Sequence, residues 1–212
     1  MVRFLTRILE NSSIWINFRR LEDYLFGLYR TRMKVIRNFG ITEKMSVIDI
    51  ACGAGQYSAI TDANYLGVDL SQKYIDAASK LYGNERKKFL CADANTAAIR
   101  DASYDIAILI DATHHLSDQE NKTLLATLNR IASQYVIICD PIQQKPTNLI
   151  GRFMNSLDRG DHIRPKNDLL NMVGGVLTIE KVVDLKMIGI ESVCIFAKPR
   201  RSTSANNGSK NQ

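Results

Sequence analysis

Two carboxylates and two glycines in the first third of the chain are spaced for binding a nucleotide-type cofactor. An apolar run ends at Gly53 and Gly55, which let the backbone turn tightly and approach a ligand closely. The next apolar run ends at Asp69, where a carboxylate can accept hydrogen bonds from both hydroxyls of a ribose. Asp49, four residues before Gly53, would repel a pyrophosphate and attract an ammonium group. The expected ligand therefore carries both a ribose and an amino-acid cation.

The same turn argues against a nicotinamide oxidoreductase. A dinucleotide site favours the pattern G-x-G-x-x-G, with the pyrophosphate on a helix N-terminus and no carboxylate nearby. This chain has Ser58 in place of the last glycine, and Asp49 lies just before the turn. S-adenosylmethionine, which has a ribose and an ammonium group, satisfies both requirements.

Residues 47–141 resemble the class I S-adenosylmethionine-dependent methyltransferases, and in particular small-molecule enzymes with a type 11-like methyltransferase domain. Four segments carry the resemblance in the family's order: Asp49 to Gly55, Leu66 to Ser71, Lys88 to Asp93 and Tyr104 to Asp111. The family favours glycine where this chain has Ala51. The resemblance implies an α/β, Rossmann-like fold: a seven-stranded, mostly parallel sheet with helices on both faces. A C-terminal antiparallel hairpin would close the sheet, with its turn at Lys186 to Gly189.

The resemblance also implies which residues hold the cofactor. Asp93 and Ala94 would meet the adenine, with the Asp93 side chain accepting from the exocyclic amino group. The strand that ends at Ile110 would place its backbone beside the transferable methyl. The full predicted cofactor set is Asp49, Ala51, Gly53, Gly55, Tyr57, Asp69, Leu70, Asp93, Ala94 and Ile110.

Few residues outside the cofactor site are candidates for acting on a methyl acceptor. Methyl transfer is a displacement, and it needs a base only if the acceptor carries a proton. His114 and His115 follow the fourth segment, where a base could reach an acceptor; alternatively they are a packing pair between loop and helix. Arg159, His162 and Arg164 lie in a polar loop where class I enzymes build substrate lids. They could bind an acidic or phosphorylated acceptor, or the two arginines could be surface charges paired with neighbouring aspartates.

Length and composition fit one globular domain. The chain has 212 residues, of which 45% are hydrophobic and 24% charged, enough for one substantial core. Strands are expected near 46–50, 65–69, 87–91, 104–110, 134–140, 176–184 and 189–197, and helices near 54–62, 71–82, 118–132, 145–157 and 166–173. The four cysteines are scattered and have no metal-ligand spacing, so we expect buried reduced thiols, a cytoplasmic protein and no metal.

The first 40 residues are helical in pattern and strongly basic, with eight arginines and lysines against three acidic residues. We favour a helical lid (1–40) over the cofactor cleft, followed by a methyltransferase domain (41–199) and a disordered polar tail (200–212). A second interpretation is peripheral contact of residues 1–40 with an anionic membrane surface, because basic residues interleaved with aromatics are typical of interfacial helices. Nucleic-acid binding through the basic stripe is the least favoured.

The predicted activity is methyl transfer from S-adenosylmethionine to a small-molecule acceptor: a quinone-like or lipid-linked compound, or a sugar. The alternative is a non-catalytic partner or regulatory module that keeps the fold and the cofactor. DNA modification is disfavoured, because the chain has no Asn-Pro-Pro-Tyr motif and no appended target-recognition domain.

Overall fold

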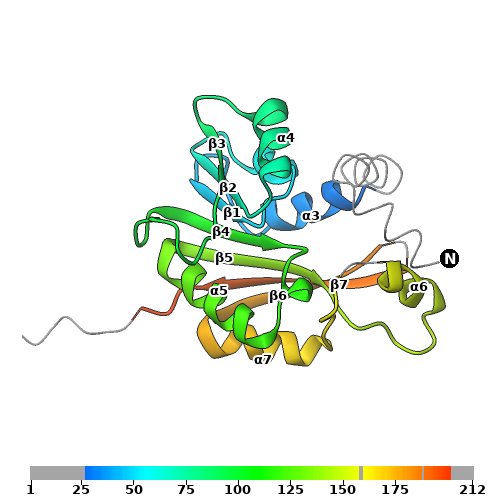
Figure 1. Ribbon diagram of the computed structural model, residues 1–212. Coiled ribbons are helices and arrows are strands. Elements are labelled where there is room, and N and C mark those ends of the chain that lie inside the picture. The colour runs from blue at the N-terminus through cyan, green and yellow to red at the C-terminus, as the bar shows by residue number, and fades with distance from the viewer. Residues whose placement is uncertain (1–26, 158–159, 188, 202–212) are drawn as a thin grey trace, which may run out of the picture.

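A computed structural model describes residues 27–157, 160–187 and 189–201, and its centre is a seven-stranded sheet (Figure 1). The strands are β1 (Val47–Ile50), β2 (Tyr65–Asp69), β3 (Lys87–Cys91), β4 (Tyr104–Ile110), β5 (Ala132–Pro141), β6 (Thr178–Met187) and β7 (Ile190–Lys198). Their order is β3-β2-β1-β4-β5-β7-β6; the first five pair in parallel, and β7 is antiparallel to both β5 and β6. The predicted α/β fold with a C-terminal antiparallel hairpin is confirmed.

Helices cover both faces of this sheet. They are α3 (Leu28–Arg37), α4 (Gln72–Tyr82), α5 (Asp118–Ile131), α6 (Leu149–Leu157) and α7 (Lys166–Val176), with short 3-10 turns η1 (Gln56–Ile60) and η2 (Thr113–His115). α5 and α7 lie on one face, and α3 and α4 lie on the other (Figure 1). Side chains alternate along each strand, so neighbouring residues supply two separate cores.

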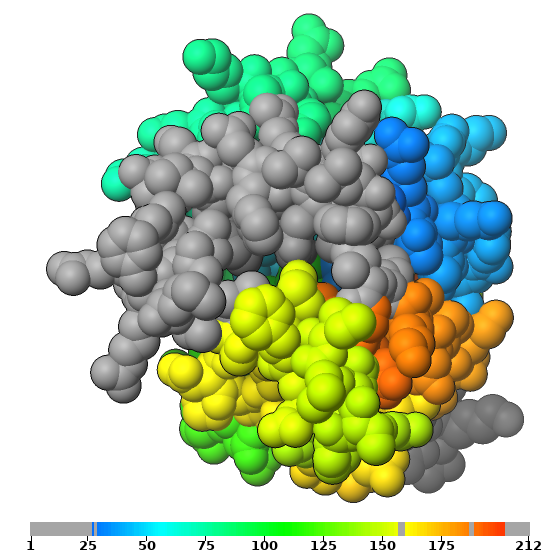
Figure 2. Space-filling model, turned by 90° about the vertical axis from the view of Figure 1, so that its right-hand side faces the viewer, coloured from blue at the N-terminus to red at the C-terminus, as the bar shows by residue number. Residues whose placement is uncertain are grey.

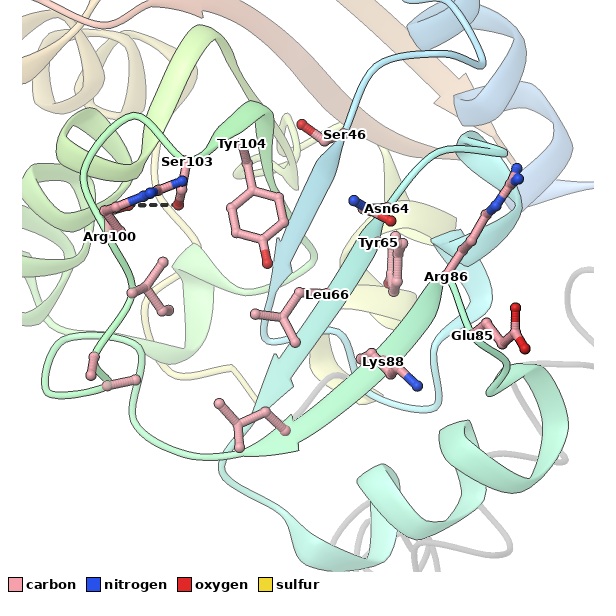
Figure 3. Close-up of a pocket in the computed structure, with 14 residues that line it drawn as sticks. Ser46, Asn64, Tyr65, Leu66, Glu85, Arg86, Lys88, Arg100, Ser103 and Tyr104 are labelled. Carbon is pink, nitrogen blue, oxygen red and sulfur yellow. Dashed lines mark hydrogen bonds between the residues drawn. The ribbon is translucent and has the colours of Figure 1, made fainter.

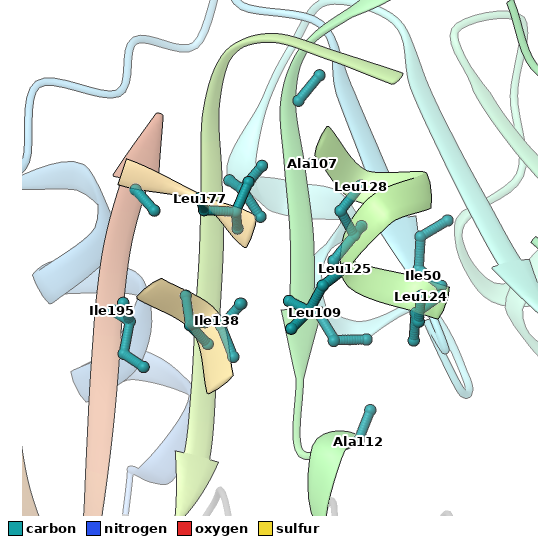
Figure 4. Close-up of a cluster of buried hydrophobic side chains, with 14 of the residues drawn as sticks. Ile50, Ala107, Leu109, Ala112, Leu124, Leu125, Leu128, Ile138, Leu177 and Ile195 are labelled. Carbon is teal, nitrogen blue, oxygen red and sulfur yellow. The ribbon is translucent and has the colours of Figure 1, made fainter. Parts of the chain in front are cut away.

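The larger core lies between the sheet and helices α5 and α7. Leu124, Leu125 and Leu128 of α5 pack on Ile50 and Leu109 of the central strands (Figure 4). Each such side chain contributes roughly 1.5–3 kcal/mol when fully buried. The central strands are therefore held firmly, and the loops at their ends start from fixed positions.

Two predicted helices differ from the structure. The helix expected near 54–62 is only the 3-10 turn η1, because Gly55 is left-handed (φ +78°) and Thr61 returns to extended backbone. The helix expected from residue 145 begins at Leu149 instead. Helix α5 begins at Asp118 as expected, and its N-cap Ser117 forms a capping box with Glu120.

The expectation that all four cysteines are free thiols is wrong for two of them. Cys139 of β5 and Cys194 of β7 lie directly opposite each other on antiparallel strands and form a disulfide. Cys52 and Cys91 are free, as predicted. The two bridged residues are 55 positions apart in the chain, so only the pairing of β5 with β7 brings them together.

The ends of the described chain also pack on the domain. Arg200 and Arg201, which the sequence assigns to the disordered tail, donate hydrogen bonds to backbone carbonyls at the C-terminal ends of α7 and α5. Carbonyls at a helix end have no partner within the helix, so arginines stabilise them. Residues 202–212 and the first 26 residues of the predicted lid lie outside the described part. The rest of that segment forms α3, and its Met33 and Ile36 are buried in the second core.

Candidate cofactor site

The predicted site lies where the direction of strand order reverses in the sheet. The chain runs from β1 outward to β3 on one side and resumes at β4 on the other side of β1. In open α/β sheets the loops that leave the carboxyl ends of two such strands diverge, and ligands bind in the crevice between them. Segment 51–55 leaves β1 there, and η2 follows β4.

The glycine turn is left-handed at three positions. Gly53 has φ +52° and Gly55 has φ +78°, and a side-chain carbon added at Gly55 would lie 2.7 Å from the Phe89 ring. Glycine is therefore required at Gly55 both for its backbone conformation and for space. Ala51 is also left-handed, with φ +57°. That conformation explains the family's preference for glycine there, and alanine adopts it at a cost of roughly 1–2 kcal/mol.

Asp69 connects the turn to the end of β2. Its Oδ2 accepts from the Gly53 backbone N–H at 2.9 Å, and its Oδ1 accepts from the Ser71 N–H at 2.8 Å. A carboxylate has about four acceptor positions, so each oxygen keeps one for a ligand hydroxyl. Asp69 is half-buried at the crevice. The geometry suits the predicted ribose contact and also holds the turn in place.

Asp49 lies beneath the turn and is almost closed to solvent, with 1% of its surface exposed. Its carboxylate accepts a 2.6 Å hydrogen bond from the Tyr65 hydroxyl, a partner that the sequence did not indicate. Burial, with a further contribution from the Asp69 charge, raises the pKa of Asp49 to about 7, although the Tyr65 bond opposes the shift. Its contact with the cofactor ammonium stays a prediction; in the structure Asp49 supports the turn from below.

The raised pKa of Asp49 predicts the direction in which the stability of Asp49→Asn should differ from that of the wild type. The folded protein holds this proton more tightly than the unfolded chain does, so the wild type should lose stability as pH rises from about 4, the unfolded value, to about 7, the folded value. The penalty is then fully present above pH about 7 and amounts to on the order of 2–4 kcal/mol. Asparagine does not ionise and still accepts from Tyr65. Urea unfolding at several pH values should show that the free energy of unfolding of Asp49→Asn increases relative to that of the wild type as pH rises.

Asp105 offers a control of opposite sign. Burial raises the pKa of Asp105, but hydrogen bonds from Ser46 and Gln134 outweigh this and hold the pKa below its ordinary value. Asp105→Asn should therefore be destabilising above the unfolded pKa, and that loss should fade on acidification. If Asp49→Asn follows the same direction as Asp105→Asn, the Asp49 carboxylate is not destabilised by burial.

The remaining predicted cofactor residues lie along the same edge of the sheet. Leu70 is 76% exposed directly after Asp69, and Asp93 is exposed after β3. Asp93 Oδ1 accepts from the Asn95 N–H at 2.9 Å, which leaves Oδ2 for a ligand. Ala94 and Ile110 are buried. An exposed apolar side chain between two carboxylates suits one face and one edge of a purine ring.

A buried ion pair that the sequence did not predict crosses the crevice. Arg32 of α3 donates to Asp111 Oδ2 at 2.5 Å and to the Tyr57 hydroxyl at 3.4 Å. Burial would lower the pKa of Arg32, but the adjacent Asp111 charge prevails and the pKa is raised. The Tyr29 and Tyr57 rings lie 5.0 Å apart. α3 is thereby tied to both the turn after β1 and the end of β4, and Arg32 Nε is buried without a hydrogen-bond partner.

The two histidines have different surroundings. His114 is 1% exposed, and its Nδ1 lies 2.9 Å from Oδ1 of Asp140, the last charged residue of β5. Asp140 also accepts from the Thr113 hydroxyl. His115 is exposed, with its ring 4.1 Å from that of His114. The structure thus gives His114 a carboxylate that fixes its orientation, an arrangement that general bases share.

Arg164 is already engaged within the protein. Its guanidinium donates to the carbonyls of Thr113, Leu116 and His162 and to the Asp118 carboxylate. The hydrogen bond and the charge of Arg164 lower the pKa of Asp118. The bonds to the carbonyls fasten the loop before α7 to η2. The partner of Arg164 is Asp118 rather than a neighbouring aspartate of its own loop. His162 is exposed, and its backbone N–H donates to the His114 carbonyl. Arg159 lies outside the described residues.

A surface pocket of about 660 Å³ lies at the opposite edge of the sheet and is not part of this site (Figure 3). Its lining includes Ser46, Asn64 and Ser103, which immediately precede β1, β2 and β4. The pocket exists because residues 92–103 connect β3 to β4 by turns, with no helix to cover Leu66 there. None of the predicted cofactor residues lines it. In the described residues, no group of three or more His, Cys, Asp or Glu side chains could hold a metal ion.

Comparison with known proteins agrees with this geometry. Residues 48–137 match a family described as a methyltransferase domain. An O-methyltransferase of Penicillium expansum is 28% identical over 110 residues, which are 47% of this chain and 39% of that protein. A sterol 24-C-methyltransferase of Aspergillus fumigatus is 28% identical over 117 residues, which are 51% of this chain and 31% of that protein. The chain therefore spans less than half the length of these relatives.

A solved structure extends the fold similarity to most of the chain. Geranyl diphosphate C-methyltransferase from Streptomyces coelicolor A3(2) superposes with a TM-score of 0.65 at 11% identity, covering 82% of this chain and 80% of that one. The matched family segment contains the glycine turn, Asp69 and the strands on both sides of the crevice. Residues 48–137 therefore match a methyltransferase domain, and the fold around them resembles that of a known methyltransferase.

Proposed function

We propose that this protein transfers the methyl group of S-adenosylmethionine to a small-molecule acceptor. The observation that carries the proposal is the crevice at the ends of β1 and β4. There a strained glycine turn, Asp69 and the exposed Leu70 and Asp93 follow one another along the edge of the sheet. When bound, the cofactor supplies an electrophilic methyl group on a sulfonium; the protein's part is to hold and align both reactants.

The residues present fit the cofactor at each of its parts. Asp69 keeps acceptor capacity for the ribose, and Leu70 and Asp93 suit the adenine face and amino group. The amino-acid part of the cofactor carries an ammonium group and a carboxylate, so it needs one negative and one positive partner in the protein. Asp49 lies under the turn, and Arg32 has a buried Nε donor without a partner near Tyr57. An unpartnered buried donor is costly, so a ligand carboxylate there would stabilise the complex.

The kind of methyl acceptor is proposed from the His114–Asp140 pair and from the relatives named above. The His114–Asp140 pair favours an acceptor that loses a proton on methylation, since a base then has a role. The sterol named for one relative and the geranyl diphosphate bound by the structural neighbour favour an apolar or lipid-linked acceptor over a sugar. We further propose that residues 1–40 act as a lid; α3, its described part, already reaches the crevice through Arg32.

The test is calorimetric titration with S-adenosylhomocysteine, the product of the proposed reaction. At a hundredfold excess over its dissociation constant the ligand should stabilise the fold by roughly 2.7 kcal/mol. Asp69→Ala removes a charge-assisted contact and should weaken binding by about 1.5–3 kcal/mol, or roughly ten- to a hundredfold. Asp76→Ala, an exposed aspartate on α4, is the matched control and should bind like the wild type.

Two outcomes would count against the proposal. Binding of NAD with no binding of S-adenosylhomocysteine would show that the site holds a different cofactor. Equal affinity of Asp69→Ala and wild type would show that the site lies elsewhere. Tight binding without methylation of any compound in a metabolite extract would instead favour a non-catalytic module.

A further inference from the structure

Helix α6 exposes its large apolar side chains, and its less exposed residues are Gly151, Met154 and Asn155. Leu149, Ile150 and Phe153 are 71%, 64% and 52% exposed and share one face of this nine-residue helix. The other large apolar side chains exposed in the described residues, Leu70, Leu81 and Leu90, lie singly on separate elements. A helix on the surface of a globular protein normally does the reverse and buries its apolar stripe.

Polar contacts fix α6 in this orientation. Asn148 donates to the Gly189 carbonyl at 2.5 Å and to Gln144 Oε1 at 2.9 Å, and it accepts from the Gly151 N–H at 3.0 Å. Asn155 donates to the Ile142 carbonyl at 3.3 Å. Gly151 is buried and leaves no room for a side chain, because an added carbon would lie 2.4 Å from the Gly189 carbonyl oxygen. The helix is therefore anchored through Asn148, Gly151 and Asn155, and rotating it inward would break these bonds.

The surroundings of this apolar face are cationic. Lys145 and Arg152 are exposed beside it, and Lys186 is exposed on the adjacent β6–β7 hairpin. Two acidic side chains are also close by: Glu191, three-quarters buried, lies 3.8 Å from Lys186 Nζ, and Asp161 lines the same pocket as Arg152. Figure 2 looks onto the carboxyl edge of the parallel strands, and the yellow-green segment of α6 forms a projecting part of that edge. The patch thus lies on the same edge as the glycine turn and the His114 loop.

We propose that the exposed side of α6, made by Leu149, Ile150 and Phe153 with Lys145, Arg152 and Lys186 around it, docks on an anionic lipid bilayer. Apolar side chains on one face with cations beside them are what an interfacial helix requires. Three side chains are too few for a stable protein partner, since such interfaces bury about 800 Å² on each side. No described helix is long and apolar enough to cross a membrane, so the contact is peripheral. This inference does not depend on methyl transfer.

Vesicle sedimentation with the full chain tests the proposal. The wild type should sediment with phosphatidylglycerol-containing vesicles, bind phosphatidylcholine vesicles far more weakly, and be released in part at about 1 M salt, where the screening length is about 3 Å. Leu149→Gln/Phe153→Gln should weaken binding at least about tenfold. Leu81→Gln, an equally drastic change at an exposed leucine of α4, should leave binding unchanged.

A second variant separates charge from apolar insertion. Lys145→Glu/Arg152→Glu should abolish the preference for phosphatidylglycerol while the protein keeps its melting temperature. Affinity for S-adenosylhomocysteine should stay within about twofold in every variant, so a failed cofactor site would be recognised separately. A wild type that ignores anionic vesicles at low salt overturns the proposal. So does a glutamine double variant that binds them like the wild type, or one that melts much earlier, because the face then packs on the protein itself.

Discussion

Asp111→Ala should destabilise the fold by about 3–5 kcal/mol, because it leaves the Arg32 guanidinium buried without its counter-charge. The Arg32 side chain is only 8% exposed and lies 2.5 Å from the Asp111 carboxylate. Such a loss is a large part of the roughly 5–15 kcal/mol that stabilises a typical domain. Arg32→Met should cost less, because the Asp111 side chain is 21% exposed and can be hydrated when unpaired. The measurement is the free energy of unfolding in urea of the wild type, the two single variants and the double variant.

The double variant Arg32→Met/Asp111→Ala should be more stable than the sum of the two single losses implies, since it leaves neither charge unpaired. The exposed pair of Lys166 and Asp184, with side chains 33% and 68% exposed, is the matched control. Asp184→Ala should cost no more than about 1 kcal/mol. Additive losses at Arg32 and Asp111 would show that α3 is held to the crevice by its apolar contacts alone.

The strands of this fold could be predicted because their signals are local. An apolar run such as 104–110 is buried on both faces in a parallel sheet, and its ends are set by the polar residues beside it. The helix expected after the glycine turn failed because its pattern extended over residues where Gly55 and Thr61 break helical backbone. The Cys139–Cys194 bridge could not be predicted, because spacing in the sequence does not show which strands become neighbours.

The residues of the candidate site also divide into those with a local signal in the sequence and those without one. Asp69 could be proposed from the sequence because a carboxylate at the end of a buried strand is a local pattern. The same pattern could have drawn attention to Asp111 and Asp140, each of which also closes an apolar run. Arg32 carries no such signal: it is one of eight cations in a basic segment, and only tertiary packing selects it. Tyr65 likewise looks like an ordinary strand residue in the sequence, and only the structure shows that its hydroxyl donates to Asp49.

His114→Gln should lower the turnover number by roughly 10²–10⁴-fold for an acceptor that loses a proton, if His114 is the general base we propose. The acceptor for this assay comes from the metabolite-extract screen. S-adenosylhomocysteine affinity should be unchanged, because His114 is not among the predicted cofactor residues. His115→Gln, a change at the exposed neighbour, is the control and should keep most of the activity.

Asp140→Asn distinguishes orientation of the imidazole from packing. The carboxylate 2.9 Å from His114 Nδ1 favours the tautomer whose Nε2 is an acceptor, whereas an amide there can donate and reverse the tautomer. Turnover should then fall by roughly 10²–10⁴-fold while the Michaelis constant and S-adenosylhomocysteine affinity change little. If His114→Gln and Asp140→Asn lower the melting temperature but leave the rate of the folded fraction intact, the pair serves only to fasten η2 to β5. If His115→Gln is the variant that loses activity, the base is the exposed histidine, and the buried pair positions the loop that carries it.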